Sequence, residues 1–131
     1  MLDTNICIYV IRKKTNRILQ KLKANRKKGL CISSITLAEL EFGNANADVS
    51  YHEKNRIALL EILTILDVKY FDEQAAREYG IIKKELKDKN CLIGPYDMLI
   101  GAHAKSLKMT LVTNNNKEFE RISGLNIENW A

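Results

Sequence analysis

The sequence contains a single proline, Pro95, and only six glycines, which are scattered along its 131 residues. No tract rich in proline, glycine or serine therefore marks a linker between two domains. The length suits one ordinary domain and is too short for two good hydrophobic cores. We therefore expect a single domain that spans residues 1–131.

Long apolar runs are absent as well. No segment approaches the roughly 20 apolar residues that cross a bilayer. The start, Met1-Leu2-Asp3, lacks the basic region and the apolar run of a signal peptide. These absences argue against a membrane protein and against a secreted one, and we expect the protein to reside in the cytoplasm.

Cysteine and histidine are too few, and too widely spaced, for a zinc site or a disulfide framework. Cys7, Cys31 and Cys91 form no CxxC pair, and His52 and His103 supply no zinc-binding spacing. Each cysteine lies in an apolar segment, which favours buried free thiols. We expect His103, which lies between small residues of a helix, to be structural.

The chain does contain enough apolar material for a core, together with an excess of positive charge. Apolar residues make up 46% and charged residues 28% of the sequence, as in globular domains. The net charge of +5 is unevenly spread, because nine lysines and arginines and no acid occur from Arg12 to Lys28. Such a segment could attract a polyanion, but a solvated helix surface explains it equally well.

Short apolar runs alternate with segments of helical periodicity. The spacing of apolar residues predicts helices near residues 18–22, 37–42, 57–66, 75–86 and 95–108. Strands are predicted for the runs too short to be helices, at residues 1–3, 30–32, 68–71, 110–113 and 126–128. Alternation of this kind implies parallel pairing through crossover helices. We expect an α/β fold, a three-layer α/β/α sandwich around a short parallel sheet.

Local signals mark where some of these elements begin and end. Ser33 or Ser34 can cap the helix that follows the strand at 30–32. The polar run from Gly43 to Ser50 predicts a break between two helices, and Gly94-Pro95 predicts a helix start, since proline suits the first turn. The strand at residues 1–3 is short, which suggests that residues are missing upstream or that translation begins within it.

Four positions carry the candidate chemistry: Asp3, Glu39, Asp97 and Asn115, the last with Glu118 close by. Each has a structural explanation when it is taken alone. Asp3 and Asn115 can cap helices, Glu39 can complete a capping box with Thr36, and a helix dipole favours a negative charge at Asp97.

Taken together, the same positions indicate a site. Asp3 ends the first predicted strand, Glu39 lies early in the helix after the second, Asn115 follows the strand at 110–113, and Asp97 opens a helix. All four are therefore expected near the carboxyl edge of the sheet, where open α/β folds place their ligands. Carboxylates that converge there repel one another unless a cation lies between them. Oxygen ligands without histidine or cysteine favour Mg²⁺, with Mn²⁺ as the other candidate. A divalent ion held in this way suits phosphodiester hydrolysis.

Other catalytic machinery is missing from the sequence. The scattered glycines form no phosphate-binding loop, and no GxSxG turn or Ser-His-Asp set is present. A phosphatase that uses Asp3 as its nucleophile remains an alternative. Position 5 is asparagine rather than a second aspartate, and Lys117 is poorly placed for the late lysine of such enzymes, so this alternative is the weaker one.

Four sequence blocks resemble those of PIN-domain ribonucleases of the VapC toxin type. In chain order they are Leu2 to Asn5, Ser34 to Leu40, Gly94 to Ala104 and Thr113 to Phe119. The resemblance implies that Asp3, Glu39 and Asp97 bind the metal. It also implies that Thr4, Asn5 and Thr113 position this triad. Asn115 stands where the family often has aspartate, which puts a second metal in doubt because an amide carries no charge; Glu118 could compensate or merely cap.

The resemblance also implies partners. Members of the family act as toxins that a VapB-like antitoxin blocks by laying its tail across the active-site groove. They generally form homodimers within a larger complex, which contacts operator DNA only through the antitoxin. Similar members cut structured RNA, notably initiator tRNA. The alternative is a non-catalytic RNA- or protein-binding module of the same fold, to which Asn115 and the basic segment would be suited.

Overall fold

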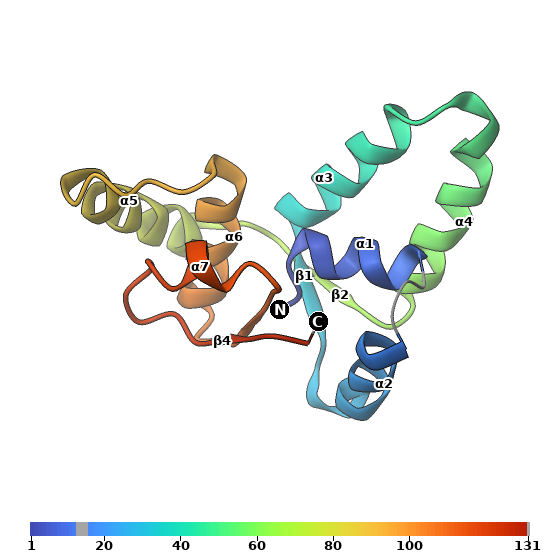
Figure 1. The fold of residues 1–131 in the computed structure, drawn as a ribbon, viewed down its shortest axis with the longest axis horizontal. Helices are drawn as coiled ribbons and strands as arrows, with labels where there is room; N and C mark the ends of the chain where they lie inside the picture. The colour runs from blue at the N-terminus through green and yellow to red at the C-terminus, as the bar shows by residue number, and fades with distance from the viewer. Residues whose placement is uncertain (13–15, 131) are drawn as a thin grey trace.

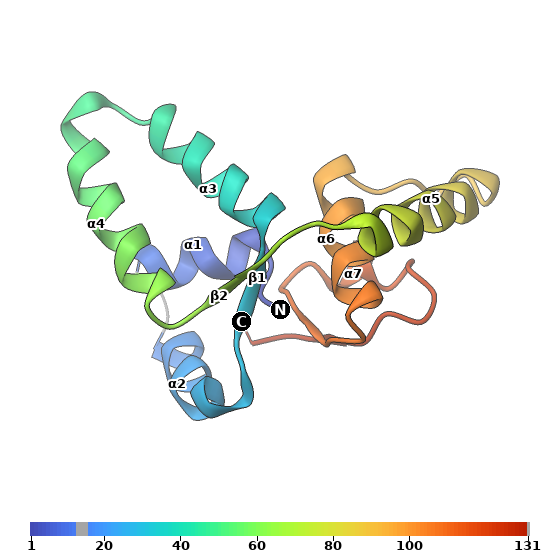
Figure 2. The same ribbon diagram turned by 180° about the vertical axis from the view of Figure 1, so that it is seen from behind.

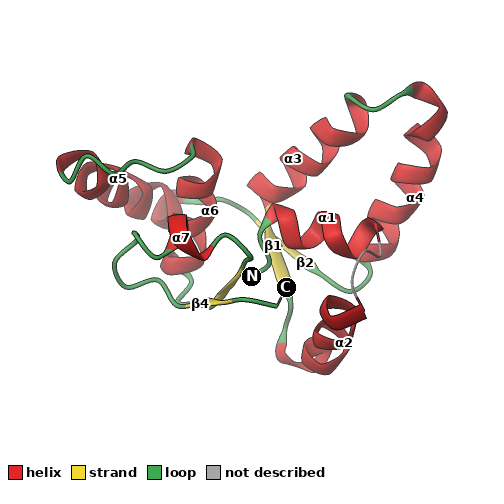
Figure 3. Cartoon of the chain, viewed as in Figure 1, coloured by secondary structure: helices red, strands yellow, loops and turns green. Residues whose placement is uncertain are grey.

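The computed structural model describes residues 1–12 and 16–130, so Lys13 and Lys14 of the basic segment lie outside the described residues. The helices are α1 (Thr4–Arg12), α2 (Asn16–Asn25), α3 (Ser34–Ala45), α4 (His52–Leu63), α5 (Glu73–Asp88), α6 (Pro95–Ser106) and α7 (Asn116–Phe119). Two short 3-10 turns are η1 (Arg26–Lys28) and η2 (Val49–Tyr51). The strands are β1 (Cys31–Ser33), β2 (Asp67–Lys69), β3 (Leu111–Val112) and β4 (Ile127–Glu128). Figure 3 shows how little of the chain is strand.

The strands form two parallel pairs that Leu2 joins into one layer. β1 pairs with β2, with Ile32 opposite Val68, and β3 pairs with β4. Leu2 forms parallel bridges to both Ile32 and Val112, and its side chain is fully buried. The predicted first strand is therefore reduced to a single bridging residue at the centre of the sheet.

Helices cover the strands from two sides, as the three-layer prediction requires. Figures 1 and 2 show α1 to α4 on one side of the strands and α5 to α7 on the other. Each side has its own apolar cluster. The first cluster includes Ile6, Leu22 and Ile62, and the second includes Ile82 and Phe119. The fold thus buries both faces of the sheet at β1 and β3, whose residues are all buried, whereas β2 and β4 are partly exposed.

Side chains and proline fix the helix starts that matter for the site. The Ser33 hydroxyl accepts a hydrogen bond from the Ile35 amide and caps α3, which confirms the expected cap. Pro95 occupies the first turn of α6 directly after Gly94, also as predicted. The predicted break within residues 43–50 separates α3 from α4, although it begins later than Gly43, because α3 continues to Ala45.

Two further sequence expectations concern membranes and thiols. Among the described residues, no helix is long and apolar enough to span a membrane. All three cysteines are free thiols; Cys7 and Cys31 are buried, as expected, whereas Cys91 is only partly buried. The expectation of buried thiols is therefore wrong for Cys91, which lies in the loop that follows α5.

Candidate functional site

Asp3 lies at the end of the bridging segment and is held from two sides. One carboxylate oxygen accepts a hydrogen bond from the Ile6 amide at 2.9 Å, which caps α1, and the other accepts one from the Thr113 hydroxyl. The side chain is only 3% exposed. Burial raises the pKa of Asp3 above its usual value, and charge repulsion from Glu39 raises it further. The two hydrogen bonds lower the pKa but do not cancel this increase. Asp3 is therefore both a helix cap and a buried acid facing other acids.

Glu39 projects from α3 toward the start of α1. Its Oε1 accepts a hydrogen bond of 2.6 Å from the Thr4 hydroxyl, and Thr4 also lies 3.2 Å from the hydroxyl of Thr36. Thr36 is completely buried, one helical turn before Glu39. Sequence reasoning missed Thr36 as a positioning residue, although its spacing to Glu39 had been noted as a capping box. The structure uses this Thr-x-x-Glu spacing to contact α1 instead of capping α3.

Asp97 and Glu118 meet across α6 and α7. The pKa of Asp97 is raised to about 7, chiefly by burial and then by the hydrogen bond and charge repulsion with Glu118. Asp3 and Glu39 also raise it by repulsion. A carboxyl that hydrogen-bonds to another carboxyl must share a proton with it, as two like charges in contact cannot both ionise freely. The four acids therefore lie within electrostatic reach of one another.

The remaining predicted residues are placed as follows. Thr113 holds Asp3, and its oxygen accepts the Asn115 amide N–H at 2.9 Å. Asn115 directs its side-chain amide onto Glu118 at 3.1 Å, so Glu118 and not Asn115 faces Asp97. The side chain of Asn5 is exposed, and its backbone N–H helps to lower the pKa of Asp3. The structure thus brings together every predicted residue except the side chain of Asn5.

Charge in this cluster is not balanced by basic side chains. The ion pairs found in the described parts of the chain lie elsewhere, between Arg56 and Glu41, Lys84 and Asp88, and Lys105 and Glu78. The described residues contain no group of three acids, cysteines or histidines already spaced for a metal ion. Mg²⁺ needs no such closed cage, since it is usually held by one or two carboxylates and keeps several waters. Oxygen-only donors with uncompensated charge fit a hydrated divalent cation of this kind.

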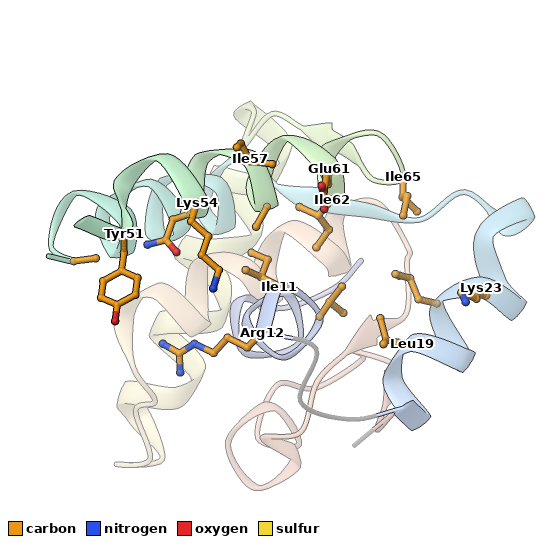
Figure 4. A pocket seen from close by; sticks show the side chains of 15 residues that line it. Ile11, Arg12, Leu19, Lys23, Tyr51, Lys54, Ile57, Glu61, Ile62 and Ile65 are labelled. Atoms are coloured by element: carbon orange, nitrogen blue, oxygen red, sulfur yellow. The ribbon is translucent and has the colours of Figure 1, made fainter. Parts of the chain in front are cut away.

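A second feature is an apolar groove of about 1030 Å³ that α1, α2 and α4 line together. Figure 4 shows Leu19 and Ile11 facing Ile62 and Ile65 across it. Basic side chains stand at its margins; Arg12 and Lys54 lie near Tyr51, and Lys23 lies toward the other end. Several lining residues are well exposed, Ile57 at 51% and Tyr51 at 56%. Exposed apolar surface with a polar rim is typical of a protein-binding site.

Comparisons with known proteins agree with this geometry. The PIN domain family matches residues 1–125. The chain is 44% identical to the tRNA(fMet)-specific endonuclease VapC of Salmonella typhimurium, over 100% of this chain and 97% of that protein. It is 42% identical to Ribonuclease VapC2 of Haemophilus influenzae over the same shares. The crystal structure of VapBC2 from Rickettsia felis, bound to a promoter DNA fragment, superposes with a TM-score of 0.94 and 40% identity, covering 100% of this chain and 98% of that one.

Proposed function

This chain belongs to the PIN domain family, among its VapC-type ribonuclease toxins, and we propose that it hydrolyses phosphodiester bonds of structured RNA with the help of Mg²⁺ or Mn²⁺. The observation that carries the proposal is the meeting of Asp3, Glu39, Asp97 and Glu118, to which no basic side chain of residues 1–12 and 16–130 is paired. Such a charge excess destabilises the fold unless a cation or a bound proton relieves it.

Asp3, Glu39 and Asp97 would hold the metal, with Glu118 as a fourth acid. When bound, the ion supplies an orienting charge for the scissile phosphate and lowers the pKa of its water. The chain's own residues keep the acids in place. Thr113 and the Ile6 amide fix both oxygens of Asp3, and Thr4 fixes Glu39. The pKa of Asp97 is raised to about 7, so its ionisation near neutral pH adds a charge for binding.

The metal proposal is tested with Asp97→Asn and Asp3→Asn, and the exposed Asp67→Asn serves as the matched control. We expect each site variant to lose at least about 100-fold in kcat, since it removes a charged ligand. Circular dichroism should show an intact fold, and Asp67→Asn should cleave RNA like the unmodified protein. Full cleavage in excess EDTA would contradict metal dependence.

The substrate proposal comes from the relatives. The matching VapC proteins of Salmonella typhimurium and Shigella flexneri are named tRNA(fMet)-specific endonucleases, and we propose that initiator tRNA is the substrate here too. The test incubates the protein and Mg²⁺ with purified initiator tRNA and, separately, with elongator methionine tRNA. We expect a single cut in the initiator tRNA and none in the elongator. Equal cutting of both would refute this specificity.

We propose that a VapB-like antitoxin covers the groove between α1, α2 and α4. Toxin–antitoxin complexes are the structural neighbours of the chain, and those of Rickettsia felis and Salmonella typhimurium are bound to DNA. Apolar side chains of the partner would fill the groove, and its acids would meet Arg12, Lys23 and Lys54. We further propose that two toxin copies join this complex, which contacts operator DNA through the antitoxin.

The antitoxin proposal is tested by co-expression with a VapB-type antitoxin, such as that of the Rickettsia felis complex. The complex should purify intact and should not cleave RNA. Ile57→Asp puts a charge in the groove and should weaken the complex, whereas Ile81→Asp, on exposed α5, should not. A complex indifferent to Ile57→Asp would place the antitoxin elsewhere.

The alternative of a non-catalytic binding module is not favoured by any observation. Its motivations were the basic segment and Asn115, which leaves the fourth position uncharged. Glu118 lies against Asp97 and supplies that charge, while Asn115 supports Glu118. A module of this kind would bind RNA equally well after Asp97→Asn and would never release a cut product.

A further inference from the structure

His103 is a buried histidine that joins three parts of the chain. It lies on α6, six residues after Asp97, and is 1% exposed. Its Nδ1 lies 2.7 Å from the hydroxyl of Ser33 at the end of β1. The backbone of Tyr70, in the link between β2 and α5, lies close enough to the ring to raise its pKa as a hydrogen-bond acceptor does. The ring of Phe71 packs against it edge to face, with centroids 5.5 Å apart.

The partners of His103 define which ring nitrogen carries the proton. A backbone carbonyl can only accept, so the ring N–H directed at Tyr70 must donate. With Nδ1 occupied by Ser33, that donor is Nε2. Burial lowers the pKa of His103 below its usual value, which favours the neutral ring. Nδ1 is then an acceptor, and the Ser33 hydroxyl donates to it.

This chain of hydrogen bonds ends at a helix that carries an acid. While the Ser33 hydroxyl donates to His103, its oxygen accepts the Ile35 amide N–H at 3.1 Å and so caps α3. α3 carries Glu39, and α6, which carries His103, begins with the turn that holds Asp97. The two helices also contact each other directly. Ser33 therefore connects the orientation of one helix to that of the other through a single imidazole.

We propose that His103 is a positioning residue which, through Ser33, fixes α6 against α3 and so sets the separation of Asp97 and Glu39. The proposal rests on the proposed function, because it takes the distance between Asp97 and Glu39 to be the one that a divalent cation requires. His103 itself touches no substrate, since its ring is enclosed by Ser33, Tyr70 and Phe71. Residues that orient metal ligands from behind typically contribute about 10–100-fold to metal affinity or activity.

The test compares three substitutions at this position. In His103→Asn the side-chain oxygen takes the place of Nδ1 and keeps the acceptor for Ser33. His103→Gln instead reaches the place of Nε2 and keeps the donor for Tyr70, and His103→Leu keeps neither. We expect His103→Asn to stay within about threefold of the unmodified protein. His103→Gln and His103→Leu should lose about 10-fold in kcat with little change in KM.

Metal binding provides a readout that does not need RNA cleavage. The dissociation constant of Mn²⁺ alone, measured by electron paramagnetic resonance, should rise about 10-fold in His103→Gln and His103→Leu and remain nearly unchanged in His103→Asn. Ser33→Ala should have a similar effect, and combining it with His103→Leu should add little, because both act through one contact. His52→Leu is the control. The His52 ring contacts the carbonyl oxygen of Ala47 at 2.9 Å, away from the four acids.

Stability measurements separate positioning from simple packing. If His103→Leu unfolds, the Asn and Gln variants still decide the question, because they differ in which hydrogen bond they keep. Equal Mn²⁺ affinity in all variants would overturn the proposal. So would losses that follow the melting temperature rather than the Ser33 contact. If the unmodified protein cuts no RNA, the proposed function fails, but the order of Mn²⁺ affinities still tests His103.

Discussion

At the residue scale, Asp97 is subject to opposing electrostatic effects. Its position in the first turn of α6 favours a negative charge there. Burial and the neighbouring acids oppose that charge more strongly, and the pKa rises to about 7. Because this folded value exceeds the unfolded one, the contribution to stability is fully present below pH about 4 and is lost as the pH rises through about 7.

We therefore predict that metal-free protein becomes less stable between pH 4 and pH 8, and that Asp97→Asn removes part of this loss. At pH 8 the variant should be more stable than the unmodified chain by roughly 1–2 kcal/mol, a value reduced for solvent screening of a half-buried group. At pH 4 the two should be alike. Urea denaturation in EDTA measures this, and a constant difference at every pH would contradict the prediction.

The thiols offer a second prediction at this scale. Cys7 is fully buried, and burial together with Asp3 raises its pKa above the usual value, so the reactive thiolate is rare. Cys31 is also buried, whereas Cys91 is partly exposed. We predict that a chromogenic disulfide reagent titrates one thiol rapidly in the native protein and three after denaturation. Cys91→Ser should remove the rapid phase, and a rapid phase that persists would show that Cys7 or Cys31 becomes accessible.

The limits of sequence reasoning at this scale are clear from Asn115 and Glu118. The sequence shows that both lie in one short segment but does not show which one faces Asp97. That depends on the α7 turn, where Asn115 bonds to Thr113 through its backbone and to Glu118 through its side chain. Asp3 and Asp97 were predictable from their places at element boundaries near the carboxyl edge of a parallel sheet, and Glu39 from its place in the helix that follows a strand.

At the element scale, the strands show what local patterns determine. The runs at 30–32 and 110–113 were correctly predicted as strands, since β1 and β3 occupy them. Residues 1–3 form only a bridge at Leu2, because α1 begins directly after them at Thr4, with Asp3 as its cap. The break predicted from Gly43 begins only after Ala45, where α3 ends. Local signals therefore predict an element better than they predict where it ends.

Helix α6 gives a prediction about close packing. A Cβ added at Gly101 would lie 2.5 Å from Cδ1 of Ile122 and 3.5 Å from the Phe119 ring, whereas one added at Gly80 in α5 would meet nothing within 4 Å. We predict that Gly101→Leu destabilises the fold by about 1–3 kcal/mol through overpacking. The matched Gly80→Leu should be neutral or stabilise by up to about 1 kcal/mol, because leucine is the better helix former.

Urea denaturation of both variants measures this difference. Gly101→Leu should also reduce RNA cleavage more than its loss of stability explains, because Phe119 belongs to the helix that carries Glu118. Equal stability of the two variants would mean that α7 moves aside without cost, and that the contact between α6 and α7 is loose.

At the scale of the whole molecule, the site and the basic segment lie at opposite edges of the sheet. Asp3 ends the bridging segment, Glu118 follows β3, and Asp97 lies in the first turn of α6. In contrast, η1 leads into the amino end of β1. Figure 1 shows α2 near the lower end of β1, whereas α3 starts at its upper end. Arg17, Lys23, Arg26, Lys27 and Lys28 are exposed there. An RNA that contacts both edges must therefore be long enough to pass along the molecule.

This arrangement distinguishes the two explanations of the basic segment that the sequence left open. If the basic segment attracts RNA, the double variant Lys27→Ser, Lys28→Ser should bind full-length tRNA more weakly in EDTA. The steepness of log affinity against log salt concentration should fall by about 1–2, because fewer phosphate contacts form and fewer counterions are released. Lys87→Ser with Lys89→Ser on the far end of α5 removes the same charge and should change the slope much less. A short oligonucleotide that reaches only the acids should bind both variants alike. Equal effects of the two pairs on tRNA would mean that net charge alone acts, and that the basic segment is a solvated helix surface.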